Sequence, residues 1–171
     1  NTNSGSIAFN DYSSNYNLHL RNCNFANYSG GLSMYVAWQT PYTNNTTDYC
    51  NLYSTGPTLA RYGNEFATLQ ALQTGTNQNL HGVSAEPLFA SDDPDVFQSA
   101  LDSAAIPIAG IVVDIDGATR NATTPDIGAK EFTLLAHDVG AKLLVSPETY
   151  CGLSNAEEIT IRIQNYGSSF E

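Results

Sequence analysis

The sequence predicts an all-β protein with one short inserted helix. Three observations support this class: short runs in which apolar and polar residues alternate, a 27-residue repeat near the N-terminus, and a change of composition after residue 132. Alternation with a period of two is typical of strands that have one face in a core and one in water. Repeats of about this length are typical of stacked solenoid coils, because one coil cannot bury its apolar face alone.

The repeat aligns residues 6–25 with residues 33–52. The matched pairs include Cys23 with Cys50, Asn24 with Asn51, and Phe25 with Leu52. Short strands are expected at residues 17–20 and 34–36. If each repeat is a coil, the paired asparagine amides stack one strand apart, whereas ordinary solvated turns are the alternative.

A short helix is expected at residues 65–73, between the coils. Asn64 is the expected N-cap and Gly75 the expected stop. One face of this helix is apolar and would pack on the coils; it carries Phe66, Leu69 and Leu72.

Further strands are expected at residues 83–89 and 106–113, then at residues 139–145 and 158–164. The last run shows the clearest alternation in the chain. It predicts inward side chains at Ile159, Ile161 and Ile163, and outward side chains at Thr160 and Arg162.

Two acidic turns lie between these two groups of strands. Asp114 and Asp116 are two residues apart, so in an extended segment both carboxylates leave the backbone on the same side, and Gly117 then permits a sharp bend. A second turn is expected at residues 123–126, followed by Gly128.

Composition excludes several classes of function. The 171 residues include 6 basic and 17 acidic side chains, a formal net charge of −11. No basic patch is available for phosphates, so we expect no nucleic-acid partner. No apolar run approaches the ~18 residues that a membrane-spanning helix needs, so we expect no membrane insertion. Three cysteines without a CxxC spacing do not support a zinc site.

The acidic turns carry a resemblance to a known family. The pattern Asp114-Ile115-Asp116-Gly117-x-x-Arg120, followed by Asp126-Ile127-Gly128-Ala129-x-Glu131-Phe132, resembles the closing motif of right-handed parallel β-helix domains in large bacterial surface and secreted proteins. Residues 83–89 resemble the strand that precedes this motif. The resemblance implies that residues 1–132 are the terminal coils of such a domain. It also implies a structural closing role for Asp114, Asp116, Gly117, Arg120, Asp126, Gly128 and Glu131.

A second resemblance concerns residues 151–167, which are similar to the opening strands of immunoglobulin-like modules in bacterial adhesins. Such sandwiches need about seven strands and ~100 residues. We therefore expect residues 133–171 to be the first strands of a truncated, incomplete β-sandwich. In the modules that it resembles, the cysteine equivalent to Cys151 pairs with a partner further along, so the resemblance implies that Cys151 is unpaired here.

Two interpretations of the first acidic turn remain open. Asp114 and Asp116 are candidate Ca²⁺ ligands, because calcium prefers carboxylate and carbonyl oxygens, although their spacing does not match an EF-hand. Alternatively, Arg120 bridges to Asp116 or Glu131 and pins the turn. Apart from this calcium candidate, we expect no cofactor.

Cys23 and Cys50 would lie on adjacent strands about 4.8 Å apart, with side chains that point the same way. That separation is within disulfide range, but parallel Cβ directions fit the bond poorly. We expect two free thiols whose sulfurs lie close together.

These observations predict a non-catalytic structural or adhesive segment of an extracellular bacterial β-helix protein, secreted or at the cell surface. Tyr35 and Tyr42 are candidate carbohydrate contacts, since Trp38 is in phase with Met34 and Val36 and should point to the core. Polysaccharide and other domains of the parent chain are the expected partners. The alternative is the C-terminal portion of a polysaccharide lyase or glycoside hydrolase whose active site lies upstream.

Overall fold

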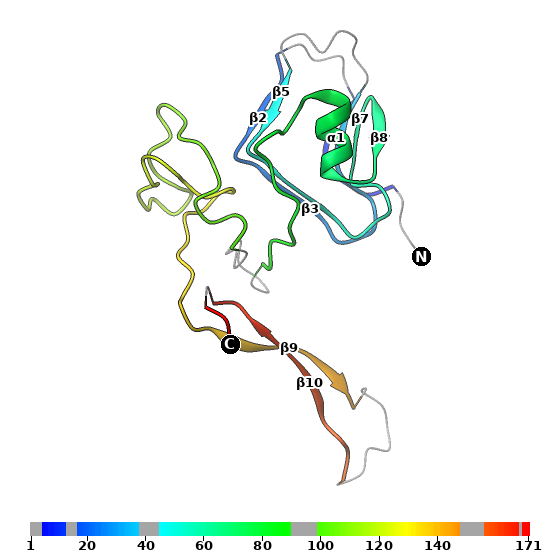
Figure 1. Cartoon of the computed structure of the whole chain (residues 1–171), viewed down its shortest axis with the longest axis vertical. Coiled ribbons are helices and arrows are strands. Elements are labelled where there is room, and N and C mark those ends of the chain that lie inside the picture. The colour runs from blue at the N-terminus through cyan, green and yellow to red at the C-terminus, as the bar shows by residue number, and fades with distance from the viewer. Residues whose placement is uncertain (1–4, 13–16, 38–44, 90–98, 148–155, 168) are drawn as a thin grey trace. The chain divides into compact units, whose positions relative to one another are not determined.

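The computed structural model describes residues 5–12, 17–37, 45–89, 99–147, 156–167 and 169–171 (Figure 1). Its elements are β1 (Ile7–Asp11), β2 (His19–Arg21), β3 (Asn24–Asn27), β4 (Leu32–Val36), β5 (Thr46–Asp48), β6 (Asn51–Ser54), β7 (Ala60–Tyr62), β8 (Asn64–Phe66), α1 (Leu69–Thr76), β9 (Val139–Ser146) and β10 (Thr160–Asn165). A strand-rich chain with one short helix agrees with the expected all-β class. Two compact units form, Asn1–Phe132 (the N-terminal unit) and Thr133–Glu171 (the C-terminal unit).

The N-terminal unit is built from parallel strand pairs that recur along the chain. β4 pairs with β1 and with β7, β5 pairs with β2, and β6 pairs with β3, all in parallel. In Figure 1, β2 and β5 lie side by side as one of these pairs. Strands β1–β3 therefore form a first repeat and β4–β6 a second, each strand lying against its counterpart.

The register confirms the 27-residue repeat over two of the three strand pairs. His19 is the Cα partner of Thr46, and Asn24 is the partner of Asn51. The alignment is wrong for β1 and β4, where Ile7 is the partner of Leu32. The reason is the length of a connection: residues 37–45 between β4 and β5 outnumber residues 12–18 between β1 and β2 by two. The longer connection changes the offset between partner residues from 25 for β1 and β4 to 27 for β2 and β5.

The core of the N-terminal unit lies between the parallel pairs. The fully buried apolar side chains of this cluster are Met34, Cys50, Leu52, Ala60, Tyr62 and Leu72. A second apolar cluster in the same unit fully buries Leu101 and Ile127. Leu72 comes from α1, and Leu69 of the same helix packs against the first cluster, as predicted. Phe66 also packs there, but it belongs to β8, so its predicted place on the helical face is wrong. Burial of this face holds the short helix in place, because eight residues are too few for a stable isolated helix in water.

The helix bounds differ from the prediction. Residues 64–66 form β8, which pairs antiparallel with β7, so Asn64 is not the N-cap. Thr68 caps the helix instead: its backbone is extended and its hydroxyl accepts a hydrogen bond from the N–H of Ala71 at 3.2 Å. The C-cap is Asn77, at φ 58°, which donates its N–H to the carbonyl of Gln73. Gly75 lies inside the helix and does not end it.

Two predicted strands are not formed as such. Within residues 83–89, Val83 makes an isolated parallel bridge to Asn51 and Phe89 is also a bridge residue, but residues 84–88 form no strand. Residues 106–113 contain a turn in which the N–H of Ile111 donates to the carbonyl of Ile108 at 3.0 Å. Pro107 has no N–H to donate to a sheet and Gly110 adopts φ 84°, which explains why this apolar run does not continue as a strand.

The C-terminal unit contains an antiparallel pair, β9 and β10, in which Ile161 lies opposite Leu144. Both strands were predicted, within two residues at each end. The inward orientation of the isoleucines was wrong: Ile159, Ile161 and Ile163 are 68%, 50% and 70% exposed. Alternation buries a face only where a second layer covers it, and the described residues of this unit supply no such layer. Within the described ranges, no helix is long and apolar enough to cross a membrane.

Candidate functional site

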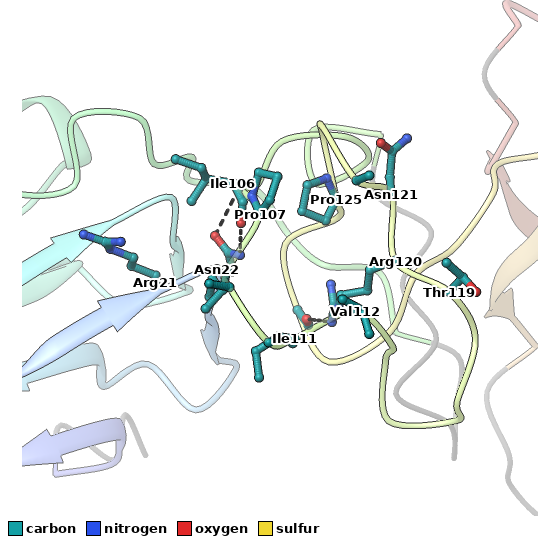
Figure 2. Close-up of a pocket in the computed structure, with 15 residues that line it drawn as sticks. Arg21, Asn22, Ile106, Pro107, Ile111, Val112, Thr119, Arg120, Asn121 and Pro125 are labelled. Atoms are coloured by element: carbon teal, nitrogen blue, oxygen red, sulfur yellow. Dashed lines mark hydrogen bonds between the residues drawn. The ribbon is translucent and has the colours of Figure 1, made fainter.

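The closing segment (residues 99–132) is anchored to the N-terminal repeats at Asn22. Asn22 adopts φ 56°, at the corner between β2 and β3. Its side-chain amide donates to the carbonyl of Ile106 at 2.6 Å and its side-chain oxygen accepts from the N–H of Ile106 at 3.2 Å, as Figure 2 shows. The carbonyl of Asn22 accepts from the N–H of Gly128 at 2.9 Å. One asparagine at a left-handed corner therefore holds two separate points of the closing segment.

The first acidic turn is organised by Asp114. One of its carboxylate oxygens accepts from the N–H groups of Asp116 and Ala118, both at 2.9 Å, and the other accepts from the N–H of Glu131 at 2.9 Å. Gly117 adopts φ 83° within this turn, as its position predicted. The hydrogen bond from the Glu131 N–H, together with those from Ala118 and Asp116, holds the pKa of Asp114 below its ordinary value.

The second turn is organised by Asp126, which is almost fully buried. Its two oxygens accept from the N–H of Ser103 at 2.7 Å and the N–H of Phe132 at 2.6 Å. Burial raises the pKa of Asp126 above its ordinary value, and the negative charges of Glu131 and Asp102 act in the same direction, although both backbone hydrogen bonds lower it. The Asp126 carboxylate therefore links the backbone at Ser103 to the backbone at Phe132.

Arg120 connects the two turns. Its guanidinium donates to the carbonyl of Gly128 at 2.6 Å, to the carbonyl of Asp126 at 3.2 Å and to the carboxylate of Glu131 at 3.3 Å. Gly128 adopts φ 125°, which favours glycine at this position. Of the two predicted partners for Arg120, the structure selects Glu131.

Asp116 pairs instead with Lys130, at 2.9 Å. The contacts of the motif thus follow the structural interpretation. A cation at Asp114 would have to compete with three backbone donors, and no group of three or more metal-ligating side chains occurs among the described residues. The calcium assignment of Asp114 and Asp116 stays a prediction.

A pocket of about 550 Å³ lies between the Arg21–Asn22 corner and the closing segment (Figure 2). Its walls are mainly apolar and include Ile106, Pro107, Ile108, Ile111, Val112 and Pro125. The polar side chains of Asn22 and Arg120 at its edge are already engaged in the hydrogen bonds given above. The described lining residues contain no carboxylate, histidine or cysteine, and the ionisable side chains among them are Arg21 and Arg120.

The predicted carbohydrate contact Tyr35 belongs to an aromatic strip, defined as Tyr12, Tyr35 and Arg61. The ring centroids of Tyr12 and Tyr35 are 4.6 Å apart, and the Arg61 guanidinium lies 5.2 Å from the Tyr35 centroid. Tyr12 is 69% exposed and Tyr35 is half-buried. Tyr42 and Trp38 lie outside the described residues. Sequence reasoning missed Tyr12 and Arg61, because only the observed registers of β1, β4 and β7 bring them beside Tyr35.

The structure also forms an Asp–His pair that sequence spacing did not indicate. Ring nitrogen Nδ1 of His81 lies 2.9 Å from one carboxylate oxygen of Asp48, and the backbone N–H of His81 donates to the other oxygen at 2.8 Å. The ring stacks on Tyr49 at 4.7 Å. Burial acts to raise the pKa of Asp48, but the hydrogen bonds from His81 and Tyr49 outweigh it and lower the pKa below its ordinary value. The other two histidines have separate partners, His19 with Thr46 and His137 with Glu171.

The cysteine prediction is confirmed for the two residues that the structure describes. Cys23 and Cys50 are free thiols, half-buried and buried respectively. They directly precede Asn24 and Asn51, which are Cα partners in the β3–β6 pair. Cys151 lies outside the described residues.

A scan against protein-family models, a search of curated proteins and a search of solved structures each find no match.

Proposed function

We propose that the N-terminal unit forms the terminal coils of a right-handed parallel β-helix in an extracellular bacterial protein, and that it contacts a neutral glycan without catalysis. Support for the coils comes from strands that pair in parallel with their counterparts one repeat later. Support for a closing role comes from Asp114, Arg120 and Asp126, whose hydrogen bonds serve the backbone of the closing segment.

The C-terminal unit is proposed to be part of an immunoglobulin-like β-sandwich. β9 and β10 alternate in sequence as sandwich strands do, yet Leu143, Leu144, Ile161 and Ile163 are at least half exposed. A second sheet packed on this pair would bury them, which is the usual way an alternating strand pair becomes stable.

The aromatic strip is the observation that carries the glycan proposal. A pyranose ring presents C–H groups that pack on tyrosine faces, and its hydroxyls bond to phenol and guanidinium groups at the edge. Tyr12 offers the most exposed ring of the strip, and Arg61 lies over the neighbouring Tyr35. The net charge of −11 disfavours polyanionic chains, so the expected ligand is a neutral polysaccharide.

Affinity gel electrophoresis with soluble xylan, glucan and mannan tests this proposal. We expect at least one of these polymers to retard the wild-type protein. Substitution Tyr12→Ala or Arg61→Ala should weaken the retardation about tenfold, equivalent to about 1.4 kcal/mol.

Tyr28→Ala is the matched control, because Tyr28 is also an exposed tyrosine in a ring pair, with Tyr53, but lies outside the aromatic strip. Equal weakening by Tyr28→Ala, or no retardation of the wild type by any of the polymers, would contradict a glycan contact at the strip. Circular dichroism of each variant establishes that the fold is retained.

A further inference from the structure

Cys23 and Cys50 occupy equivalent positions in the two repeats. Each follows a residue in the left-handed region, Asn22 at φ 56° and Tyr49 at φ 54°. The N–H of Asn51 donates to the carbonyl of Cys23 at 2.8 Å, so the two cysteines lie at neighbouring points of adjacent strands. Parallel strands are about 4.8 Å apart, which stacks one thiol on the other.

The corners direct both thiols toward backbone carbonyls. The thiol of Cys23 lies 3.1 Å from the carbonyl of Arg21, and the thiol of Cys50 lies 3.3 Å from the carbonyl of Asp48. Cys50 is also within hydrogen-bonding reach of the Cys23 sulfur. When Cys23 is ionised, the Cys50 S–H can turn from the carbonyl of Asp48 and donate a hydrogen bond to the Cys23 sulfur.

The two thiols differ in access. Cys50 is fully buried, whereas Cys23 is half-buried and lines a pocket of about 400 Å³. Phe25 and Phe89 are apolar members of the wall, and Gly128 of the closing segment also contributes to it. A small apolar reagent that enters this pocket meets Cys23, while the Cys50 sulfur stays covered.

The surroundings of the two thiols shift their pKa values in opposite directions. The hydrogen bond from Cys50 lowers the pKa of Cys23 to about 7, against the effect of burial. The same interaction, followed by burial and the nearby Asp48 charge, raises the pKa of Cys50. The described wall of this pocket holds no ionisable side chain besides Cys23. At pH 7, about half of Cys23 is therefore thiolate, whereas Cys50 remains a thiol.

We propose that Cys23 is a site of thiol–disulfide exchange with small external disulfides, and that Cys50 is the positioning residue that stabilises its thiolate. The Cys23 thiolate attacks one sulfur of the disulfide and forms a new S–S bond. The S–S bond of the reagent breaks, and its other half leaves as a thiolate that takes a proton from water. One disulfide replaces another, so no separate oxidant is consumed.

The exchange is expected to stop at the mixed disulfide on Cys23. Two conditions oppose a subsequent Cys23–Cys50 disulfide. Cys50 would have to ionise while buried, and its side chain would have to turn, because parallel Cβ directions fit a disulfide poorly.

The test uses 4,4′-dithiodipyridine as the probe, on the full chain carrying Cys151→Ser. Any thiopyridone released then comes from reaction at Cys23 or Cys50. Rates are followed from about pH 5.5 to 9 by release of thiopyridone, and the labelled residue is identified by peptide mass mapping. We expect one equivalent of thiopyridone, the label on Cys23, and a rate profile with its midpoint near pH 7.

Two substitutions separate the role of Cys50 from a packing effect. Cys50→Ala removes the donor and should move the midpoint toward about 8.5. At pH 6.5 the thiolate fraction would fall about 25-fold while nucleophilicity rises about fivefold, a net slowing of about fivefold. Cys50→Ser keeps an O–H donor and should restore a midpoint close to that of the wild type.

Several outcomes would overturn the proposal. They are a wild-type midpoint near 8.5, a label on Cys50, a second equivalent of thiopyridone with an internal disulfide, or identical profiles for Cys50→Ala and Cys50→Ser. The first three are measured with Cys50 present, so they stand even if a Cys50 variant fails to fold.

Discussion

At the scale of single residues, the carboxylates of the closing segment act as acceptors for backbone N–H groups. Asp126 is the clearest case, because each of its oxygens pairs with a different N–H and it is almost fully buried. In Asp126→Asn, one oxygen becomes an NH₂ group that faces a donor. We expect a loss of about 1–3 kcal/mol in the free energy of unfolding, measured by urea denaturation.

The control for this substitution is Asp116→Asn. The Asp116 side chain is 59% exposed, although that of its partner Lys130 is 14% exposed, so Asp116→Asn should change the unfolding free energy by less than about 1 kcal/mol. Equal losses of unfolding free energy in Asp126→Asn and Asp116→Asn would contradict the prediction that the buried hydrogen bonds of Asp126 contribute more to stability.

Asp114 provides a prediction about pH. Its folded-state pKa lies below the unfolded value of about 3.9, because its carboxylate accepts three backbone hydrogen bonds. Its contribution to stability is therefore present above pH 3.9 and is lost as the pH falls through the folded pKa. The melting temperature of Asp114→Asn should drop less between pH 6 and pH 3 than that of the wild type. Parallel melting curves over this range would contradict the assignment.

At the scale of elements, Asn51 joins strand β6 to the irregular run at residues 83–89. Its side-chain amide donates to Asn24 and to the carbonyl of Ala85, and its oxygen accepts from the N–H of Ala85, each at 2.9 Å. Asn51→Ala would leave the backbone of Ala85 without its partners, and we expect a loss of about 1–3 kcal/mol in urea unfolding. Asn10→Ala, at an exposed position on β1, should be nearly neutral, and a comparable loss there would contradict this account.

At the scale of the whole molecule, the N-terminal unit depends on how the closing segment attaches to the repeats. Asn22→Gly keeps a residue suited to φ 56° but removes both side-chain bonds to Ile106. Hydrogen exchange at the Ile106 N–H should accelerate about tenfold, as expected for local opening that costs about 1.4 kcal/mol less. Proteolysis within residues 99–132 should accelerate with it, while β3 and β6 stay protected.

Tyr49→Gly is the matched control, because Tyr49 has the same backbone conformation one repeat later and is not bonded to the closing segment. If both glycine substitutions accelerate exchange at Ile106 equally, the effect comes from the corner backbone and the Asn22 side chain is not the anchor.

The sequence by itself determined those features that depend on local backbone chemistry. Alternation identified β9 and β10, the repeat placed Asn24 opposite Asn51, and Gly117 and Gly128 marked turns that need positive φ. These predictions hold because side-chain period and glycine conformational freedom act within a few residues.

The tertiary structure decided what depends on connection lengths and on the layers that are present. A two-residue difference between loops shifted β1 against β4, and the packing of β8 on β7 moved the helix start to Leu69. The same long-range contacts bring Asp48 to His81 and Tyr12 to Tyr35, pairs that no local spacing indicates. The isoleucines of β10 keep their alternation yet stay exposed, because a pattern specifies which face is apolar, and only a second layer can bury it.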